Sequence, residues 1–246
     1  MKSERPVTPI FLATEVLIYL TFIITDLTGQ APGLSGPVKY TGIILVFAHA
    51  LILSVGARRK ESFLITAALF FTAVADVFLL FFSSDMRLLI VGLVSFSITQ
   101  TLYGILTSQK KSTAKRILTP VVTAAVAAVI SAIIGNLLHY DIVTGFFVFL
   151  VFYYASTFGI NTARSWSTFK KSRLRTDLVF ALGLTLFVLC DINVVIRNLN
   201  TFYYELIPGS TVNAAAILSW IFYLPSQVMI SICCKAPNTR RMPDAG

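Results

Sequence analysis

The sequence predicts an all-α integral membrane protein, a bundle of eight transmembrane helices with both termini in the cytoplasm. Of its 246 residues, 56% are hydrophobic and only 13% are charged, and the mean hydropathy is +0.81. A soluble domain of this size needs far more charge to cover its surface. The lengths of the apolar runs and the positions of the basic residues predict the same fold class.

Eight apolar runs are long enough to cross a bilayer, whose hydrocarbon core takes about 20 residues of helix. They cover residues 10–28, 38–57, 62–82, 88–108, 117–136, 142–163, 174–197 and 212–234. We expect Pro120 in the first turn of its helix, where proline is tolerated. We expect Pro225 to kink its helix and to free the carbonyl of Ile221.

The basic residues alternate between the two sides of the membrane when the N-terminus is placed inside. All Lys and Arg residues except Lys39, Arg87 and Arg197 then lie in the cytoplasm. Positive charge in cytoplasmic loops is the usual determinant of topology, so this pattern supports both the helix number and the orientation. It also explains the net charge of +9 without nucleic acid as a partner; the expected partners are membrane lipids.

Two carboxylates inside the apolar runs are the first candidates for function. A charge at mid-membrane costs about 2.5–3.5 kcal/mol, so Asp76 and Asp191 need a reason to be there. Both runs cross from inside to outside, and at about 1.5 Å per residue the two side chains reach a similar depth in the outer half. We therefore expect the carboxylates to face one another; the alternative is that each pairs with a separate neighbouring helix.

The run that follows each Asp run carries a polar stripe with spacings of three and four residues. In the fourth run the stripe comprises Ser97, Gln100, Tyr103, Gly104 and Thr107, and in the eighth run Ser219, Trp220, Tyr223, Gln227 and Ser231. This pattern predicts one membrane domain over residues 1–246, with two candidate parallel half-repeats at 10–108 and 117–234. The alternative is that the stripes only hold helices together, at about 0.6 kcal/mol per bond.

Three polar residues near the outer ends are candidate substrate ligands. Lys39 and Arg87 break the charge rule and could hold a phosphate, with snorkelling to the interface as the alternative. Asn198 shares a helix face with Asp191. The sequence has no GxSxG, HExxH, P-loop, GxGxxG or paired CxxC motif, so we expect no metal or cofactor. Acid–base chemistry by carboxylates, or ion movement as in a proton-coupled transporter, remains.

Two segments resemble the signatures of the YhhN family of lysoplasmalogenases. The first comprises Ala75-Asp76-Val77-Phe78-Leu79-Leu80, Gly92-Leu93, Phe96 and Tyr103; the second comprises Gly183, Leu186-Phe187, Cys190-Asp191, Val194, Tyr223 and Gln227. The resemblance covers the chain from about Lys39 to the end of the eighth run. The sequence departs from the family pattern at Gln100, where a His is expected, at Cys190, where a Ser is expected, and at Tyr40, where a Pro is expected.

The resemblance implies a membrane hydrolase that cleaves the vinyl ether bond of lysoplasmalogens, which are lysophospholipids. The products are a fatty aldehyde and glycerophosphoethanolamine or glycerophosphocholine. Asp76 and Asp191 are then the expected catalytic residues. The expected substrate-binding residues are Gln100, Tyr103, Tyr223, Gln227, Lys39, Arg87 and Asn198. A non-catalytic lipid-binding relative is the other alternative.

Overall fold

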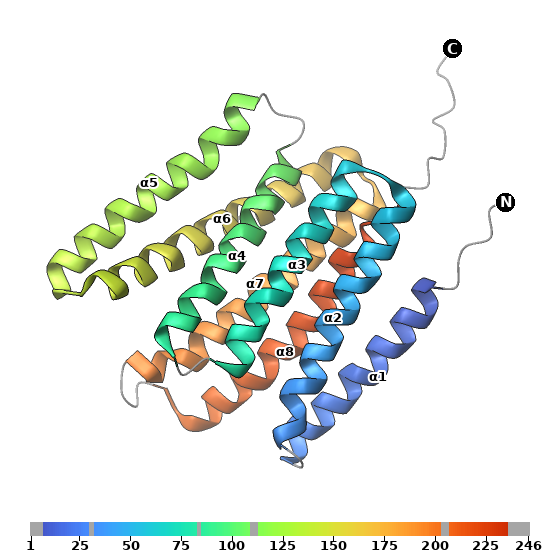
Figure 1. Cartoon of the computed structure of the whole chain (residues 1–246), viewed down its shortest axis with the longest axis horizontal. Helices are drawn as coiled ribbons and strands as arrows, with labels where there is room; N and C mark the ends of the chain where they lie inside the picture. Colours follow the sequence, from blue (N-terminus) through green and yellow to red (C-terminus); the bar gives the residue numbers. More distant parts are fainter. Residues whose placement is uncertain (1–6, 30–31, 83–84, 109–112, 203–206, 236–246) are drawn as a thin grey trace.

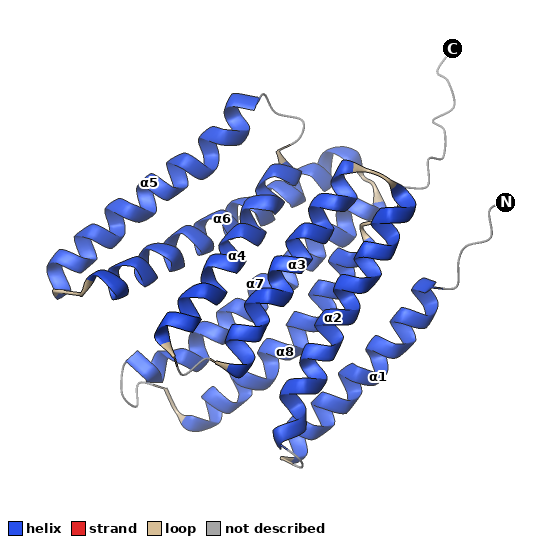
Figure 2. Ribbon diagram, viewed as in Figure 1, coloured by secondary structure: helices blue, strands red, loops and turns tan. Residues whose placement is uncertain are grey.

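The computed structural model describes residues 7–29, 32–82, 85–108, 113–202 and 207–235. Within these residues the chain forms eight helices and no strand (Figures 1 and 2). All eight helices are long and apolar enough to cross a membrane. The predicted fold class, an all-α multi-pass membrane protein with eight transmembrane helices, is therefore confirmed; the cytoplasmic location of the termini stays a prediction.

Each predicted run forms most of one helix. The helices are α1 (Val7–Thr28), α2 (Pro32–Ala57), α3 (Lys60–Phe81), α4 (Met86–Thr107), α5 (Thr113–Leu138), α6 (Ile142–Ser172), α7 (Arg175–Phe202) and α8 (Gly209–Ile232). Most helix termini differ from the predicted ones by a few residues. An apolar run shows which residues can cross the membrane, but it does not show at which residue the hydrogen bonds of the helix end.

Helices α5 and α6 differ most from the prediction. Helix α6 continues past residue 163 to Ser172, since no Gly or Pro interrupts its backbone there. It ends at Arg173, which has a left-handed conformation (φ 55°) and whose N–H bonds to the carbonyl of Phe169. Helix α5 begins at Thr113, so Pro120 lies inside it and the predicted first-turn position was wrong. A proline this close to the start removes only one internal hydrogen bond, which the helix tolerates.

Glycines allow the two helices that carry the aspartates to approach their partners closely. On α7, a Cβ at Gly183 would lie 3.2 Å from the carbonyl oxygen of Ser226 on α8. On α4, a Cβ at Gly92 would lie 3.3 Å from the carbonyl oxygen of Ala75 on α3. Small residues at such crossings are the usual way for membrane helices to pack, because the attraction is mostly van der Waals contact. These crossings fix α3 against α4 and α7 against α8.

Helix α5 lies at the edge of the bundle. In Figure 1, α5 stands apart from α1, α2 and α3, and within the described residues it contacts only α6 and part of α4. Helix α7 contacts both α6 and α8. The contacts α1–α2, α2–α3 and α3–α4 recur as α5–α6, α6–α7 and α7–α8. This order agrees with the candidate half-repeats, which stay a prediction.

The proline inside α8 frees the predicted carbonyl, whereas the kink stays a prediction. Pro225 cannot donate a hydrogen bond to the carbonyl four residues earlier, which is that of Ile221. The Tyr19 hydroxyl on α1 donates to this carbonyl oxygen instead, at 3.1 Å. The freed carbonyl is thus confirmed, and it joins the first helix of the chain to the last.

The variant Tyr19→Phe is expected to lower the free energy of unfolding by about 0.5–1.5 kcal/mol, because it removes the only replacement donor for that carbonyl among the described residues. Denaturant unfolding of the purified protein in detergent measures the change. Tyr140→Phe, at an exposed position in the turn between α5 and α6, is the control and should be neutral. Equal stability of both variants would contradict the role of Tyr19.

Candidate functional site

Asp76 lies on α3 and is enclosed by the bundle. Its side chain is 3% exposed, and its Oδ2 accepts a hydrogen bond of 2.7 Å from the Tyr223 hydroxyl on α8. Helix α3 contacts α8, and the polar stripe of α8 places Tyr223 on the face that meets α3. The structure therefore gives this intramembrane carboxylate a neutral donor rather than a cation.

Asp191 lies on α7 and has a matching arrangement with a different helix. Its Oδ2 accepts a hydrogen bond of 2.6 Å from the Tyr154 hydroxyl on α6. Asp191 is half-buried, so it is the more accessible of the two acids. Its donor comes from the preceding helix, whereas the donor to Asp76 comes from the last helix.

The two aspartates lie on neighbouring parts of the bundle. The carboxyl groups are close enough to interact electrostatically, and the Cys190 thiol interacts with both. Neither Oδ1 accepts a hydrogen bond from the described residues. Each acid thus has one oxygen fixed by a tyrosine and one that remains able to exchange a proton with a ligand.

Aromatic rings pack around the tyrosine donors of the two aspartates. The ring of Phe187 on α7 lies 5.3 Å from that of Tyr223, 4.8 Å from that of Phe158 and 5.8 Å from that of Phe96. Phe96 in turn lies 5.8 Å from Tyr154. These apolar walls lower the local dielectric, so the charges and dipoles inside act more strongly than they do in water.

The structure encloses three of the predicted substrate-binding residues. Gln100, Tyr103 and Gln227 have no exposed surface. The Gln100 Nε2, the Tyr103 hydroxyl and the Gln227 Oε1 have no hydrogen-bond partner among the described residues. Of the two predicted polar stripes, only Tyr223 contacts an aspartate directly. Gln100 is one side chain removed, since it lies beside Tyr154.

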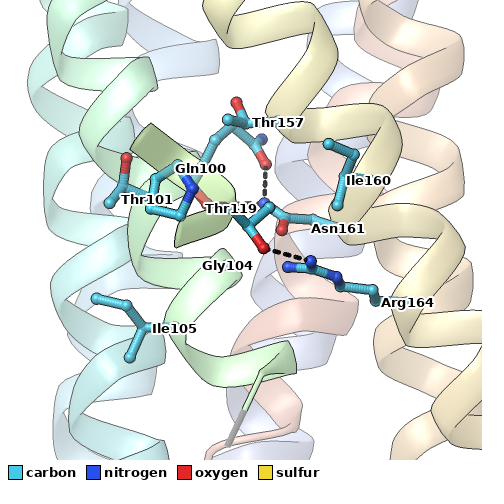
Figure 3. A pocket seen from close by; sticks show the side chains of 10 residues that line it. Gln100, Thr101, Gly104, Ile105, Thr119, Thr157, Ile160, Asn161 and Arg164 are labelled. Atoms are coloured by element: carbon cyan, nitrogen blue, oxygen red, sulfur yellow. Dashed lines mark hydrogen bonds between the residues drawn. The ribbon is translucent and has the colours of Figure 1, made fainter. Parts of the chain in front are cut away.

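Gln100 is held from α6 by Asn161. The Asn161 Nδ2 donates to the Gln100 backbone oxygen at 2.7 Å and to its Oε1 at 3.2 Å (Figure 3). Because the carboxamide oxygen is occupied in this way, the amide nitrogen is the group that remains for Tyr154 or for water. Gln100 stands where the family pattern has a His, and a carboxamide does not carry a proton as an imidazole does.

The three predicted residues at the outer ends differ in burial and in their partners. Lys39 is 8% exposed, and its Nζ lies 2.7 Å from Asp26 Oδ2 on α1. It also lies over the ring of Trp220, 5.0 Å from the centroid. Arg87 and Asn198 are exposed, and Asn198 donates to the carbonyl of Val194 on its own helix. The ammonium of Lys39 is therefore already neutralised within the protein.

Sequence reasoning missed Tyr154 and the role of Asn161. Tyr154, Thr157 and Asn161 are spaced by three and four residues, so they share one face of α6. This is the same signal that identified the stripes of α4 and α8. It was obscured because the half-repeat pattern pairs each Asp helix with the helix that follows it. In the described part of the chain, no three His, Cys, Asp or Glu side chains group as metal ligands.

Comparison with known proteins gives one match. No curated protein and no solved structure matches the chain. The model of the YhhN family matches residues 35–233, which is most of the sequence and includes both aspartates and both tyrosine donors. The chain therefore belongs to the YhhN family.

Proposed function

We propose that this protein is a membrane hydrolase that cleaves the vinyl ether bond of lysoplasmalogens. The products would be a fatty aldehyde and glycerophosphoethanolamine or glycerophosphocholine. The observation that carries the proposal is the pair of acids on α3 and α7, each held by a tyrosine hydroxyl and each within electrostatic reach of the other. Family membership supports a protein of this kind.

Hydrolysis of an enol ether needs one acid and one base. The acid protonates the β carbon of the double bond, which leaves an oxocarbenium ion at the carbon that bears oxygen. The base removes a proton from water as the water adds to that carbon, and the resulting hemiacetal collapses to aldehyde and alcohol. Glycosidases stabilise a similar cation with two carboxyl groups. Two neighbouring carboxylates in an apolar site do not both ionise easily, so a pair that shares one proton supplies both roles.

In this proposal individual atoms have separate roles. Tyr223 and Tyr154 hold the Oδ2 atoms, and the Oδ1 atoms transfer protons. Because Asp191 is more exposed than Asp76, the reacting group enters from the side of α7. The fatty chain lies along the Phe-rich helices and reaches the site laterally from the bilayer.

Mass spectrometry of lysoplasmalogen incubated with the purified protein tests the proposal. Free fatty aldehyde should form from the vinyl ether lipid. It should not form from the lysophospholipid with the saturated ether, which has the same head group and chain but cannot form the cation by protonation. A thermal unfolding measurement establishes that the protein sample is folded. If such a sample releases no aldehyde from the vinyl ether lipid, the proposal is overturned.

A second candidate function, proton-coupled transport, is favoured by Glu15 on α1. This residue is 3% exposed, and neither carboxylate oxygen has a hydrogen-bond partner in the described part of the chain. Its Oε2 would lie 3.2 Å from a Cβ at Gly42 of α2. An intramembrane acid without a partner is the kind of group that binds and releases protons in carriers. Proton-driven flux in liposomes that is lost in Glu15→Gln, together with no aldehyde release, would favour this function.

A further inference from the structure

A second polar pocket lies between α4, α5 and α6, and one end of it is formed by Gln100, which lies beside Tyr154. Figure 3 shows a small pocket at this point. The polar residues and the glycine that line it are Gln100, Gly104, Thr119, Thr157, Asn161 and Arg164. A Cβ at Gly104 would lie 3.3 Å from the Asn161 Oδ1, so the glycine keeps the wall of the pocket open beside Asn161.

Arg164 brings a permanent positive charge to this pocket. Its Nη1 donates to the Ser108 hydroxyl at 3.0 Å, and its Nη2 donates to the Thr119 hydroxyl at 2.8 Å (Figure 3). These bonds use two of the five N–H donors of a guanidinium. Among the described residues, the ion pairs are Lys39–Asp26 and Arg59–Glu61, and no carboxylate pairs with Arg164. The residues between α4 and α5 include no Asp or Glu.

The partners of Arg164 are therefore neutral hydroxyls, although the side chain is half-buried between apolar helices. A guanidinium has a planar fork of donors that matches the oxygens of a phosphate. The hydroxyls of Ser108 and Thr119 fix its plane at the wall of the pocket. The charge and the remaining donors match the chemistry of an oxyanion.

The guanidinium end of the pocket lies along α6 from the aspartates. Arg164 follows Tyr154 by ten residues on α6, which is about 15 Å along the helix axis.

We propose that this pocket binds the phosphate of a phospholipid from the surrounding membrane, at a site separate from the aspartate pair. In the part of the chain that the structure describes, helix α5 contacts only α6 and part of α4, so the pocket lies at the edge of the bundle, where lipids would surround the protein. Arg164 is the binding residue, and Thr119 and Ser108 orient it. The proposal does not depend on what the aspartates do.

Native mass spectrometry of the full chain in detergent tests this site. The probes are phosphatidylglycerol, diacylglycerol with the same chains, and inorganic phosphate. Phosphatidylglycerol should bind, diacylglycerol should not, and Arg164→Gln should weaken phosphatidylglycerol binding roughly tenfold or more, the loss expected for one hydrogen bond to a charged group. Arg164→Lys should retain part of the affinity. Arg173→Gln, at the exposed end of α6, is the control and should bind as the wild type does.

Two results would overturn the proposal. The first is that phosphatidylglycerol binds the wild type and Arg164→Gln equally well. The second is that phosphatidylglycerol and diacylglycerol bind the wild type equally well. The second comparison uses only the wild type, so it does not depend on whether the variant folds. Inorganic phosphate could also bind this site as tightly as phosphatidylglycerol does. That result would show a site for anions and overturn its assignment to a lipid.

Discussion

Replacing Asp76 or Asp191 by Asn is expected to abolish aldehyde release from lysoplasmalogen. Asparagine has the shape of aspartate, and its oxygen can still accept the hydrogen bond from Tyr223 or Tyr154. It cannot hold or take up the proton that the reaction moves. General acid–base catalysis is worth about 10²–10⁴-fold in rate, so each variant should lose at least that much. Initial rates of aldehyde formation, normalised to folded protein, measure the loss.

Replacing an exposed aspartate should not have the effect of replacing Asp76 or Asp191. Asp85→Asn is the matched control, because Asp85 is an exposed N-cap of α4 that accepts from the Arg87 N–H, and asparagine caps helices equally well. This variant should keep full activity. Tyr223→Phe and Tyr154→Phe remove one hydrogen bond each and should lose less activity than the Asn variants. Full activity in Asp76→Asn or Asp191→Asn would refute the acid–base role.

Removing the carboxylate of Asp26 is expected to destabilise the protein by about 3–5 kcal/mol, the usual cost of leaving a buried charge without its partner. Lys39 and Asp26 are separated by 2.7 Å, and their side chains are only 10% and 15% exposed. The Ser35 hydroxyl also donates to Asp26, at 2.5 Å. In Asp26→Leu the ammonium would remain between the rings of Phe22 and Trp220 with no counter-charge. Denaturant unfolding in detergent measures the loss.

The double variant Asp26→Leu with Lys39→Met separates the charge from the packing. Replacing both partners of a buried ion pair by apolar residues is often neutral, so the double variant should recover most of the stability. Glu61→Gln is the control, because Arg59 and Glu61 form an ion pair of 3.5 Å that is about 40% exposed; its effect should be at most about 1 kcal/mol. A double variant that is no more stable than Asp26→Leu would show that the charge is not the cause.

The sequence was sufficient for the fold because hydropathy and basic loops act on one helix at a time. A run of about 20 apolar residues is suited to cross the bilayer whichever helices lie beside it. Pro225 could be interpreted for the same reason, since the carbonyl it frees lies on its own helix. The donor to that carbonyl, Tyr19, could not be predicted, because it depends on which face of α1 meets α8.

The candidate site was predicted only where a residue's chemistry alone identifies it. Asp76 and Asp191 were candidates because a carboxylate inside a membrane is rare. Their tyrosine donors come from α8 and α6, and periodicity does not say which helix lies beside which. Lys39 was taken as a phosphate ligand because it broke the charge rule. The structure pairs it with Asp26, and this contact between α1 and α2 has no signature in either segment alone.

The two acids are anchored to different parts of the bundle, Asp76 to α8 and Asp191 to α6. Among the described residues, α6 and α8 do not touch, and α7 packs between them. The distance between the two carboxyl groups therefore depends on how closely α7 packs against α6 and against α8. A larger side chain at Gly183, on the side of α7 that faces α8, would move one acid relative to the other without altering either. Under the proposed function, turnover would then respond to a change in helix packing rather than to a change in the acids themselves.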